Sequence, residues 1–175
     1  VASFSINYRL SGVATYPAAV DDCVAAVKFV RANAALFNID IDRMAVRGGS
    51  AGGHLALMMA FLEPDADETN AAGQPIQNRF VCVSAKNPPT DLSAADMAGE
   101  RALVAFMAGT VQEHPDDYRQ GSPVTHVSAD DPPVLMMHGT EDRTVPYTQA
   151  TLLEALLGQT GVPVELITVE GAGHG

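Results

Sequence analysis

Six residues, Gly48-Gly49-Ser50-Ala51-Gly52-Gly53, constrain the fold of this 175-residue chain more than any other stretch. The residues before them, 44–46, have the pattern of a short buried strand, and residues 54–60 after them have the pattern of a helix. A tight turn between the two leaves little room for side chains and needs backbone angles that glycine adopts at low cost. The hexapeptide therefore predicts a strand, a strained turn that carries Ser50, and a helix.

Two chemistries fit this turn. In a nucleophile elbow, a serine between glycines is held clear of the backbone, and the backbone N–H of the next residue, here Ala51, faces the same space. A glycine-rich turn at a helix N-terminus can instead bind a phosphate through its N–H groups. The hexapeptide alone favours the elbow, and residues further along the chain bear on the choice.

Strand and helix patterns alternate along the chain, which predicts an α/β fold with a mostly parallel sheet and helices on both faces. The length fits a single domain over residues 1–175. A long irregular stretch at about 87–131 is expected to carry a lid or substrate-binding elements. The expected strands are 2–8, 44–46, 80–85, 133–138 and 164–169, and the expected helices are one from Pro17 to about Arg31, then 54–60, 101–107 and 149–157.

Composition excludes some classes of partner. The formal net charge is −11 at pH 7, which argues against nucleic acid because affinity for phosphates rests on Lys and Arg. No apolar run approaches the length of a membrane span, so we expect a soluble protein, cytoplasmic or secreted. Cys23 and Cys82 are expected to be buried thiols without a redox or metal role.

A catalytic serine needs a base, and the base needs a third group to orient it. Asp142 follows the strand 133–138, and His174 follows the strand 164–169, so both are expected at the carboxyl edge of the sheet, where the elbow opens. The acid could also be Glu141 or Glu170, but Glu170 lies too near His174 in sequence for the usual arrangement. The order Ser50, Asp142, His174 therefore favours a catalytic triad over a phosphate loop.

Two further histidines lie near these motifs. His138 ends a predicted buried strand and is expected to support the turn that bears Asp142. His54 lies one helical turn beyond Ser50 and is expected to be a packing residue or to support the site from behind, with contact to the substrate as the less favoured alternative. Ligands are not clustered at spacings that would bind a metal, so none is expected.

Several motifs together resemble the esterase and lipase branch of the α/β-hydrolase fold, close to the hormone-sensitive-lipase-like and the bacterial feruloyl or acetyl-xylan esterase groups. The resemblance covers essentially the whole chain. The motifs are Asn7-Tyr8-Arg9-Leu10, Gly49-Ser50-Ala51-Gly52-Gly53-His54-Leu55-Ala56, Ser122-Pro123-Val124-Thr125-His126-Val127, His138-Gly139-Thr140-Glu141-Asp142 and Gly173-His174.

The resemblance implies a serine carboxylic-ester hydrolase that acts through an acyl-enzyme on short-chain or carbohydrate-linked acyl esters. Ser50 would be the nucleophile, His174 the base and Asp142 the acid that orients it. The backbone N–H of Ala51 would stabilise the oxyanion. The resemblance implies no metal or organic cofactor and a small-molecule ester as substrate, and it leaves the oligomeric state open.

The chain departs from the family pattern upstream. The family carries a His-Gly-Gly-Gly-type motif, which supplies further oxyanion N–H groups, before the region where this chain begins. The family's first three strands and a final helix beyond His174 are also absent. We therefore expect an N-terminally truncated piece of an esterase of about 250–300 residues, with a gapped or re-paired sheet and weak or no turnover.

Two other functions fit the same motifs. A peptidase of the prolyl-oligopeptidase type shares the elbow and the order of acid and histidine, but it usually has an aromatic residue after the serine, where this chain has Ala51. A catalytically silent fragment or scaffold of the same fold is the second alternative. The presence of Ser50, Asp142 and His174 argues against it for the intact protein.

Overall fold

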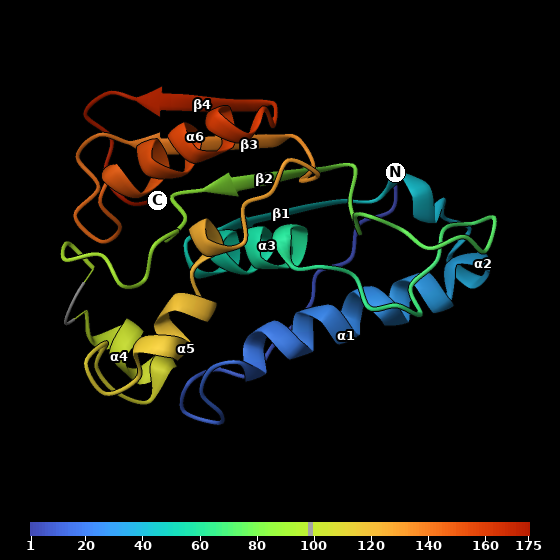
Figure 1. The fold of residues 1–175 in the computed structure, drawn as a ribbon, viewed down its shortest axis with the longest axis horizontal. Coiled ribbons are helices and arrows are strands. Elements are labelled where there is room, and N and C mark those ends of the chain that lie inside the picture. The colour runs from blue at the N-terminus through green and yellow to red at the C-terminus, as the bar shows by residue number, and fades with distance from the viewer. Residues whose placement is uncertain (98–99) are drawn as a thin grey trace.

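Four parallel strands form one sheet in the order β1-β2-β3-β4 in this computed structural model, which describes residues 1–97 and 100–175 (Figure 1). Val46, Val83, Val134 and Val164 lie side by side across the sheet and point to the same face. Such β-branched side chains pack well on a pleated surface, which is why these segments form strands. The strands are β1 (Ala45–Gly49), β2 (Cys82–Lys86), β3 (Val134–Gly139) and β4 (Val164–Val169).

The helices follow the predicted alternation with strands. The helix expected at 101–107 and the strand expected at 164–169 have the bounds that the sequence predicts, whereas α2, α5 and two short 3-10 turns were not expected. The helices are α1 (Ala18–Ala32), α2 (Ala34–Phe37), α3 (Ala51–Phe61), α4 (Arg101–Met107), α5 (Pro115–Gln120) and α6 (Thr148–Thr160), and the 3-10 turns are η1 (Ile41–Arg43) and η2 (Pro123–Thr125).

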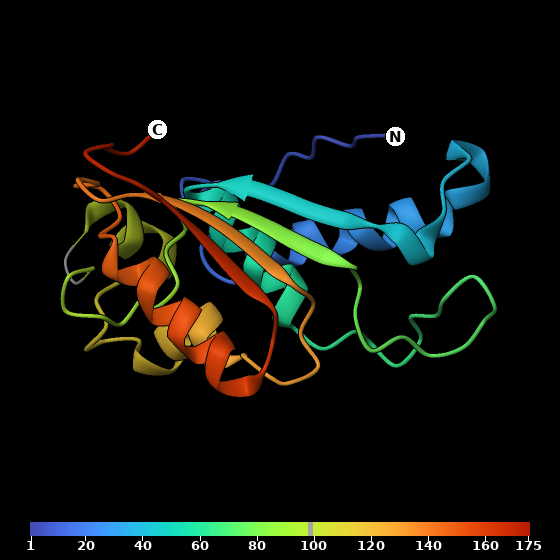
Figure 2. The ribbon, with the colours of Figure 1, turned by 90° about the horizontal axis from the view of Figure 1, so that it is seen from above.

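Helix α3 lies at the centre of the packed face of the sheet. Nine of its eleven residues are buried, because it contacts β1 and β2 on one side and α1 on the other. Helix α6 packs against β4 on the same face, so α1, α3 and α6 form a layer on one side of the strands (Figure 2). The hydrophobic core lies between this layer and the valine row.

The opposite face of the sheet is open. The parallel α/β architecture is confirmed, but the expectation of helices on both faces is not met in the described part of the chain, where the helices that pack on the strands lie on one side (Figure 2). The expectation that Cys82 is buried was also wrong, whereas Cys23 is buried. Side chains alternate along a strand, so Val83 points into the core and Cys82 points outward. The exposed apolar side chains on the outward face include Leu135, Met137, Ile167 and Val169.

The prediction of a strand at residues 2–8 was wrong, because these residues form no hydrogen-bonded ladder with the sheet. The expected gap in the sheet is not seen either, since β1, β2, β3 and β4 are each hydrogen-bonded to the next. An alternating pattern becomes a strand only when a neighbouring strand accepts its hydrogen bonds. The segment is held instead by side chains, since Phe4 packs edge-on against Phe37, and Arg9, the residue that follows the segment, forms a salt bridge with Asp22 at 2.8 Å.

The stretch 87–131 between β2 and β3 contains α4, α5 and η2, and residues 98 and 99 of this stretch lie outside the described residues. Its buried side chains form a second, smaller core of their own, made up of Leu92, Met97, Leu103, Met107 and Tyr118. Among the helices described, none combines the length and apolar composition needed to cross a membrane.

Candidate active site

Ser50 stands at the turn between β1 and α3, as the sequence predicts. Its backbone angles, φ 52° and ψ −124°, lie in a region that costs a residue with a side chain on the order of 1–3 kcal/mol. The turn is fixed to the sheet because the Ser50 N–H donates to the Lys86 carbonyl at 2.8 Å. A strained serine held this way presents its side chain at the end of the strand.

Two glycines of the hexapeptide allow the close packing of this turn. A Cβ on Gly48 would overlap the carbonyl group of Gly52, and a Cβ on Gly53 would lie 3.2 Å from the Lys86 carbonyl oxygen. A Cβ on Gly52 would meet no atom within 4 Å. The steric need for glycine therefore falls on Gly48 and Gly53 rather than on every position around Ser50.

The structure brings Ser50, His174 and Asp142 into one chain of hydrogen bonds. The Nδ1–H of His174 donates to Asp142 Oδ2 at 2.7 Å, which leaves a lone pair on Nε2. That Nε2 lies 2.8 Å from Ser50 Oγ and can accept the serine proton. The His174 side chain is 24% exposed, whereas the Asp142 side chain is buried. The three residues thus have the geometry that nucleophile, base and acid require.

The carboxylate of Asp142 accepts hydrogen bonds from three separate parts of the chain. Its Oδ1 accepts the N–H groups of Thr144 and Val145, both at 2.9 Å, in the turn that follows β3. Its Oδ2 accepts the side-chain N–H of Asn87 at 2.6 Å in addition to His174. Burial alone would raise the pKa of Asp142, but these hydrogen bonds outweigh it and lower the pKa to about 2. Asp142 is therefore ionised across the range in which a histidine works as a base.

Asn87 is a residue of this site that the sequence analysis missed. It follows β2 directly, is buried, and has φ 48°, a left-handed conformation that asparagine tolerates better than most residues. No local motif marks it, because its partner Asp142 lies 55 positions away. The available signal was its place at the carboxyl end of a strand, where polar side chains of different strands converge.

The loop that carries His174 is fixed against the turn that carries Asp142. The N–H of Glu141 donates to the Ala172 carbonyl at 2.9 Å, and the N–H of Gly171 donates to Thr140 Oγ1 at 2.9 Å. A Cβ on Gly139 would overlap the Ala172 carbonyl, so glycine at this position lets the two loops meet. This close approach sets the distance from Asp142 to His174.

The other acids and histidines lie outside this chain of hydrogen bonds. Glu141 and Glu170 are exposed, and Glu170 accepts from Thr140 Oγ1 at 3.3 Å rather than from His174. His138 supports the acid turn as predicted: it is fully buried, and its Nε2–H donates to the Val145 carbonyl at 2.9 Å. His54 is also buried, and its Nε2–H donates to the Gly121 carbonyl at 2.7 Å. Burial lowers the pKa of His54, and the bond to Gly121 offsets part of the effect.

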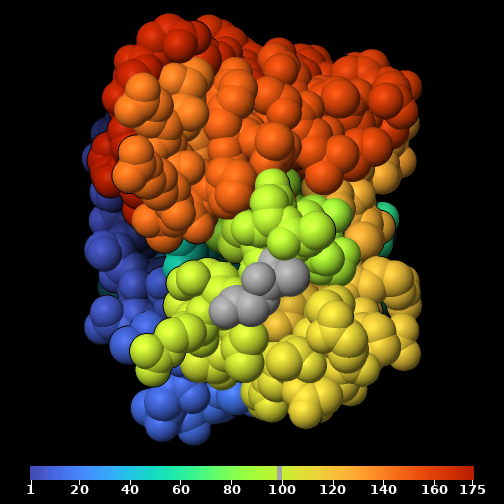
Figure 3. All heavy atoms as spheres, turned by 90° about the vertical axis from the view of Figure 1, so that its left-hand side faces the viewer, coloured from blue at the N-terminus to red at the C-terminus, as the bar shows by residue number. Residues whose placement is uncertain are grey.

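A pocket of about 380 Å³ opens beside Ser50. Figure 3 shows a hollow with teal atoms, the colour of the start of α3, at its bottom. Orange atoms from around residue 140, blue atoms of the N-terminal segment and green atoms from around residues 90–105 surround it. Ala51 lines this pocket and is the first residue of α3, so its N–H has no acceptor inside the helix and is free to bind an oxyanion. The described residues include no group of three or more His, Cys, Asp or Glu side chains able to hold a metal.

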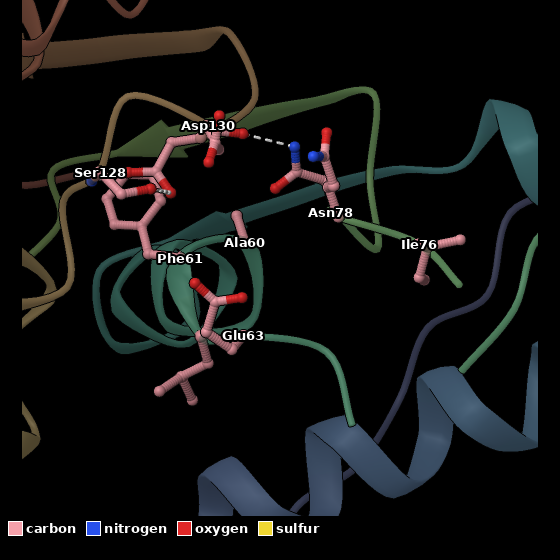
Figure 4. A pocket seen from close by; sticks show the side chains of 10 residues that line it. Ala60, Phe61, Glu63, Ile76, Asn78, Ser128 and Asp130 are labelled. Atoms are coloured by element: carbon pink, nitrogen blue, oxygen red, sulfur yellow. Dashed lines mark hydrogen bonds between the residues drawn. The ribbon is translucent and has the colours of Figure 1, made fainter. Parts of the chain in front are cut away.

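A second, polar cavity of about 220 Å³ lies at the opposite edge of the sheet, beyond the end of α3 (Figure 4). Two pairs of its polar groups are engaged with one another: Asn78 donates to the Asp130 carbonyl at 2.5 Å, and the N–H of Ser128 donates to Asp131 at 2.8 Å. No residue of the Ser50–His174–Asp142 chain lines it. The pocket beside Ser50 is therefore the candidate site.

Comparison with known proteins agrees with this geometry, since residues 1–157 match the BD-FAE family. The chain belongs to the BD-FAE family. This membership and the similar proteins confirm the predicted resemblance to α/β-hydrolase esterases. The esterase LipC of Mycobacterium tuberculosis is 30% identical over 180 residues, which cover 98% of this chain and 44% of LipC.

Two solved structures have the same fold. A truncated carbohydrate esterase from gut microbiota has a TM-score of 0.83 at 28% identity, over 97% of this chain and 66% of that chain. Esterase 2 of Thermogutta terrifontis, phosphorylated by paraoxon, has a TM-score of 0.72 at 27% identity, over 97% of this chain and 58% of that chain. This BD-FAE chain spans less than half the length of the first curated relatives it matches.

Proposed function

We propose that this BD-FAE chain carries the catalytic centre of a serine carboxylic-ester hydrolase. The observation that carries the proposal is the unbroken chain of hydrogen bonds from Ser50 Oγ through His174 to the ionised Asp142. A serine is a weak nucleophile until a base takes its proton, and this arrangement supplies the base and its orienting acid. The esterase names of its relatives support the same reaction class.

The mechanism follows from these positions. Ser50 Oγ attacks the ester carbonyl carbon while His174 Nε2 takes the serine proton, and the carbonyl oxygen becomes an oxyanion that the Ala51 N–H binds. When the intermediate collapses, the bond to the alcohol oxygen breaks and His174 returns its proton to that oxygen, leaving an acyl-serine. A water then attacks the acyl carbon while His174 takes a proton from it. The bond between the acyl carbon and Ser50 Oγ breaks, His174 gives the proton to Ser50 Oγ, and the free acid leaves. Asp142 stays ionised and stabilises the imidazolium throughout.

The substrates are proposed to be short-chain or carbohydrate-linked acyl esters. The pocket beside Ser50 is lined mainly by apolar side chains, which suits an acyl group rather than a charged one. A relative described as a carbohydrate esterase supports the carbohydrate-linked class. The stretch 87–131 contributes Pro89, Leu92 and Phe106 to the lining, which supports its role as a substrate-binding excursion.

The test is hydrolysis of p-nitrophenyl acetate together with covalent labelling by paraoxon, followed by intact mass. We expect turnover and a single phosphoryl adduct, both abolished in Ser50→Ala and both retained in the control Ser84→Ala, whose serine lies on the open face of the sheet. Preference for a prolyl-amide substrate over the ester would indicate a peptidase instead. Equal ester hydrolysis by the protein and by Ser50→Ala would refute the triad, and a chain that neither turns over nor labels would be a silent scaffold.

A further inference from the structure

The pocket beside Ser50 does not include the side chain of His174 in its lining. Ser50 and Ala51 both line the pocket, whereas His174 does not and is partly exposed to solvent. His174 must reach the oxygen of the leaving alcohol in order to protonate it. The alcohol half of the ester is therefore directed to the solvent side with His174, and the other half of the ester faces the pocket.

Phe106 of α4 contributes an aromatic side chain to the wall of the pocket. Its ring meets the ring of Tyr16 edge-on, with centroids 5.8 Å apart, and the ring of His54 edge-on at 5.9 Å. Its carbonyl oxygen accepts the Tyr16 N–H at 2.7 Å, which fixes the backbone behind the ring. Both neighbours therefore restrict the rotation of Phe106 away from the pocket.

His54 is itself immobile, so it cannot move aside for Phe106. It is 4% exposed and bonded through Nε2 to the carbonyl of Gly121, at the end of α5. The backbone of Gly121 is packed so closely that an added Cβ would lie 2.6 Å from Met107 Cε and 3.1 Å from the Asp117 carbonyl. Phe106 is thus part of a rigid wall, and a rigid wall limits the length of whatever enters from Ser50.

We propose that this pocket binds the acyl group of the ester and that Phe106 limits the length of that acyl group. The inference rests on the proposed ester hydrolysis at Ser50 and adds the substrate class: esters that join a short apolar acyl group to an alcohol that remains open to solvent. A large or carbohydrate-like alcohol fits this arrangement, because it needs no enclosed site of its own.

The experiment measures kcat/KM for p-nitrophenyl acetate, butyrate and octanoate in the protein, in Phe106→Ala and in the conservative variant Phe106→Leu. We expect the octanoate-to-butyrate ratio to rise by about tenfold or more in Phe106→Ala, and by less in Phe106→Leu, because one methylene in an apolar pocket already changes discrimination by roughly tenfold. Phe29→Ala is the matched control, since Phe29 is an exposed ring on α1, outside the pocket lining, and the ratio should not change.

A second series keeps the acetyl group and varies the alcohol from methanol to a sugar. We expect the Phe106 variants to leave this alcohol profile unchanged. An unchanged chain-length ratio in a folded, active Phe106→Leu, or a shift in alcohol preference instead, would overturn the acyl assignment while ester hydrolysis stands. Absence of both hydrolysis and paraoxon labelling in the unaltered protein would instead overturn the proposed function, and the acyl assignment with it.

Discussion

The acid end and the nucleophile end of the candidate triad are built in opposite ways. Asp142 is 8% exposed and accepts hydrogen bonds from Asn87, Thr144, Val145 and His174. Ser50 is only half-buried, and its backbone is strained. The acid end therefore stabilises the fold while it orients the base, whereas the nucleophile end costs stability in order to expose a reactive oxygen.

Replacement of the acid should have the largest effect. In Asp142→Ala, His174 loses the group that fixes its tautomer, and we expect ester hydrolysis to fall by about 10⁴-fold. The donors of Asn87 and Val145 would also be left buried without an acceptor, so the free energy of unfolding should fall by about 3 kcal/mol. Ser50→Ala should lose activity to a similar degree with no loss of stability. Equal free energies of unfolding for the two variants, measured by urea unfolding, would contradict the claim that only the acid end stabilises the fold.

Acid should remove the stabilising contribution of Asp142. Its pKa is about 2 in the folded chain and near 3.8 when unperturbed, so the unfolded state takes up a proton first as the pH falls. The contribution is complete above about pH 4 and is lost as the pH falls through about 2, which amounts to about 2 kcal/mol. The free energy of unfolding, measured as a function of pH, should show this loss in the protein but not in Asp142→Asn. If the two pH profiles were parallel, another group would be responsible for the loss.

Asn87 tests whether the acid end depends on a residue outside the triad. Asn87→Gly keeps the left-handed backbone but removes the donor to Asp142, and we expect a loss of about 2 kcal/mol, because hydrogen bonds to charged groups are worth about 1.5–3 kcal/mol. The pKa of Asp142 should rise as well, which moves the acid-induced loss of stability to higher pH. Asn87→Ala adds backbone strain and should be less stable than Asn87→Gly. An unchanged pH profile in Asn87→Gly would show that Asn87 only fills space.

The smallest expected effect is a gain. Ser50→Gly removes the side chain that strains the elbow, so the free energy of unfolding should rise by about 1 kcal/mol while activity is lost. Ser50→Ala keeps a Cβ at the same backbone angles and is the control, with no comparable gain. A thermal melt of both variants measures the difference. If Ser50→Gly proves no more stable than Ser50→Ala, the nucleophile end stores no strain.

The sequence predicted the parts of the site that local motifs encode. The sequence pattern predicts Ser50 in its glycine turn, and Asp142 and His174 after their strands, and these three residues form one chain of hydrogen bonds. Their roles as nucleophile, acid and base remain predictions. Local motifs suffice here because a turn between a strand and a helix has few backbone solutions, and each needs particular residues at fixed positions.

Other features depended on contacts between distant residues. Residues 2–8 have an alternating pattern but no ladder partner, so the pattern alone predicted a strand wrongly. Cys82 lies in a predicted strand, but which face it points to depends on where α3 and α6 pack. A strand pattern shows that a segment is able to hydrogen-bond to a neighbouring strand and to bury one face. Whether a neighbouring strand is present, and which face the helices bury, depends on the rest of the chain.

The sequence by itself determined the α/β class, the strained serine turn and the three residues of the candidate triad, because these follow from short-range backbone geometry and residue chemistry. Only the tertiary structure decided that Asn87 holds the acid, that Gly139 lets the loops of Asp142 and His174 meet, and that Phe106 lines the pocket. Each of these joins segments tens of residues apart. Such contacts are selected by the packing of the whole chain, which no local pattern encodes.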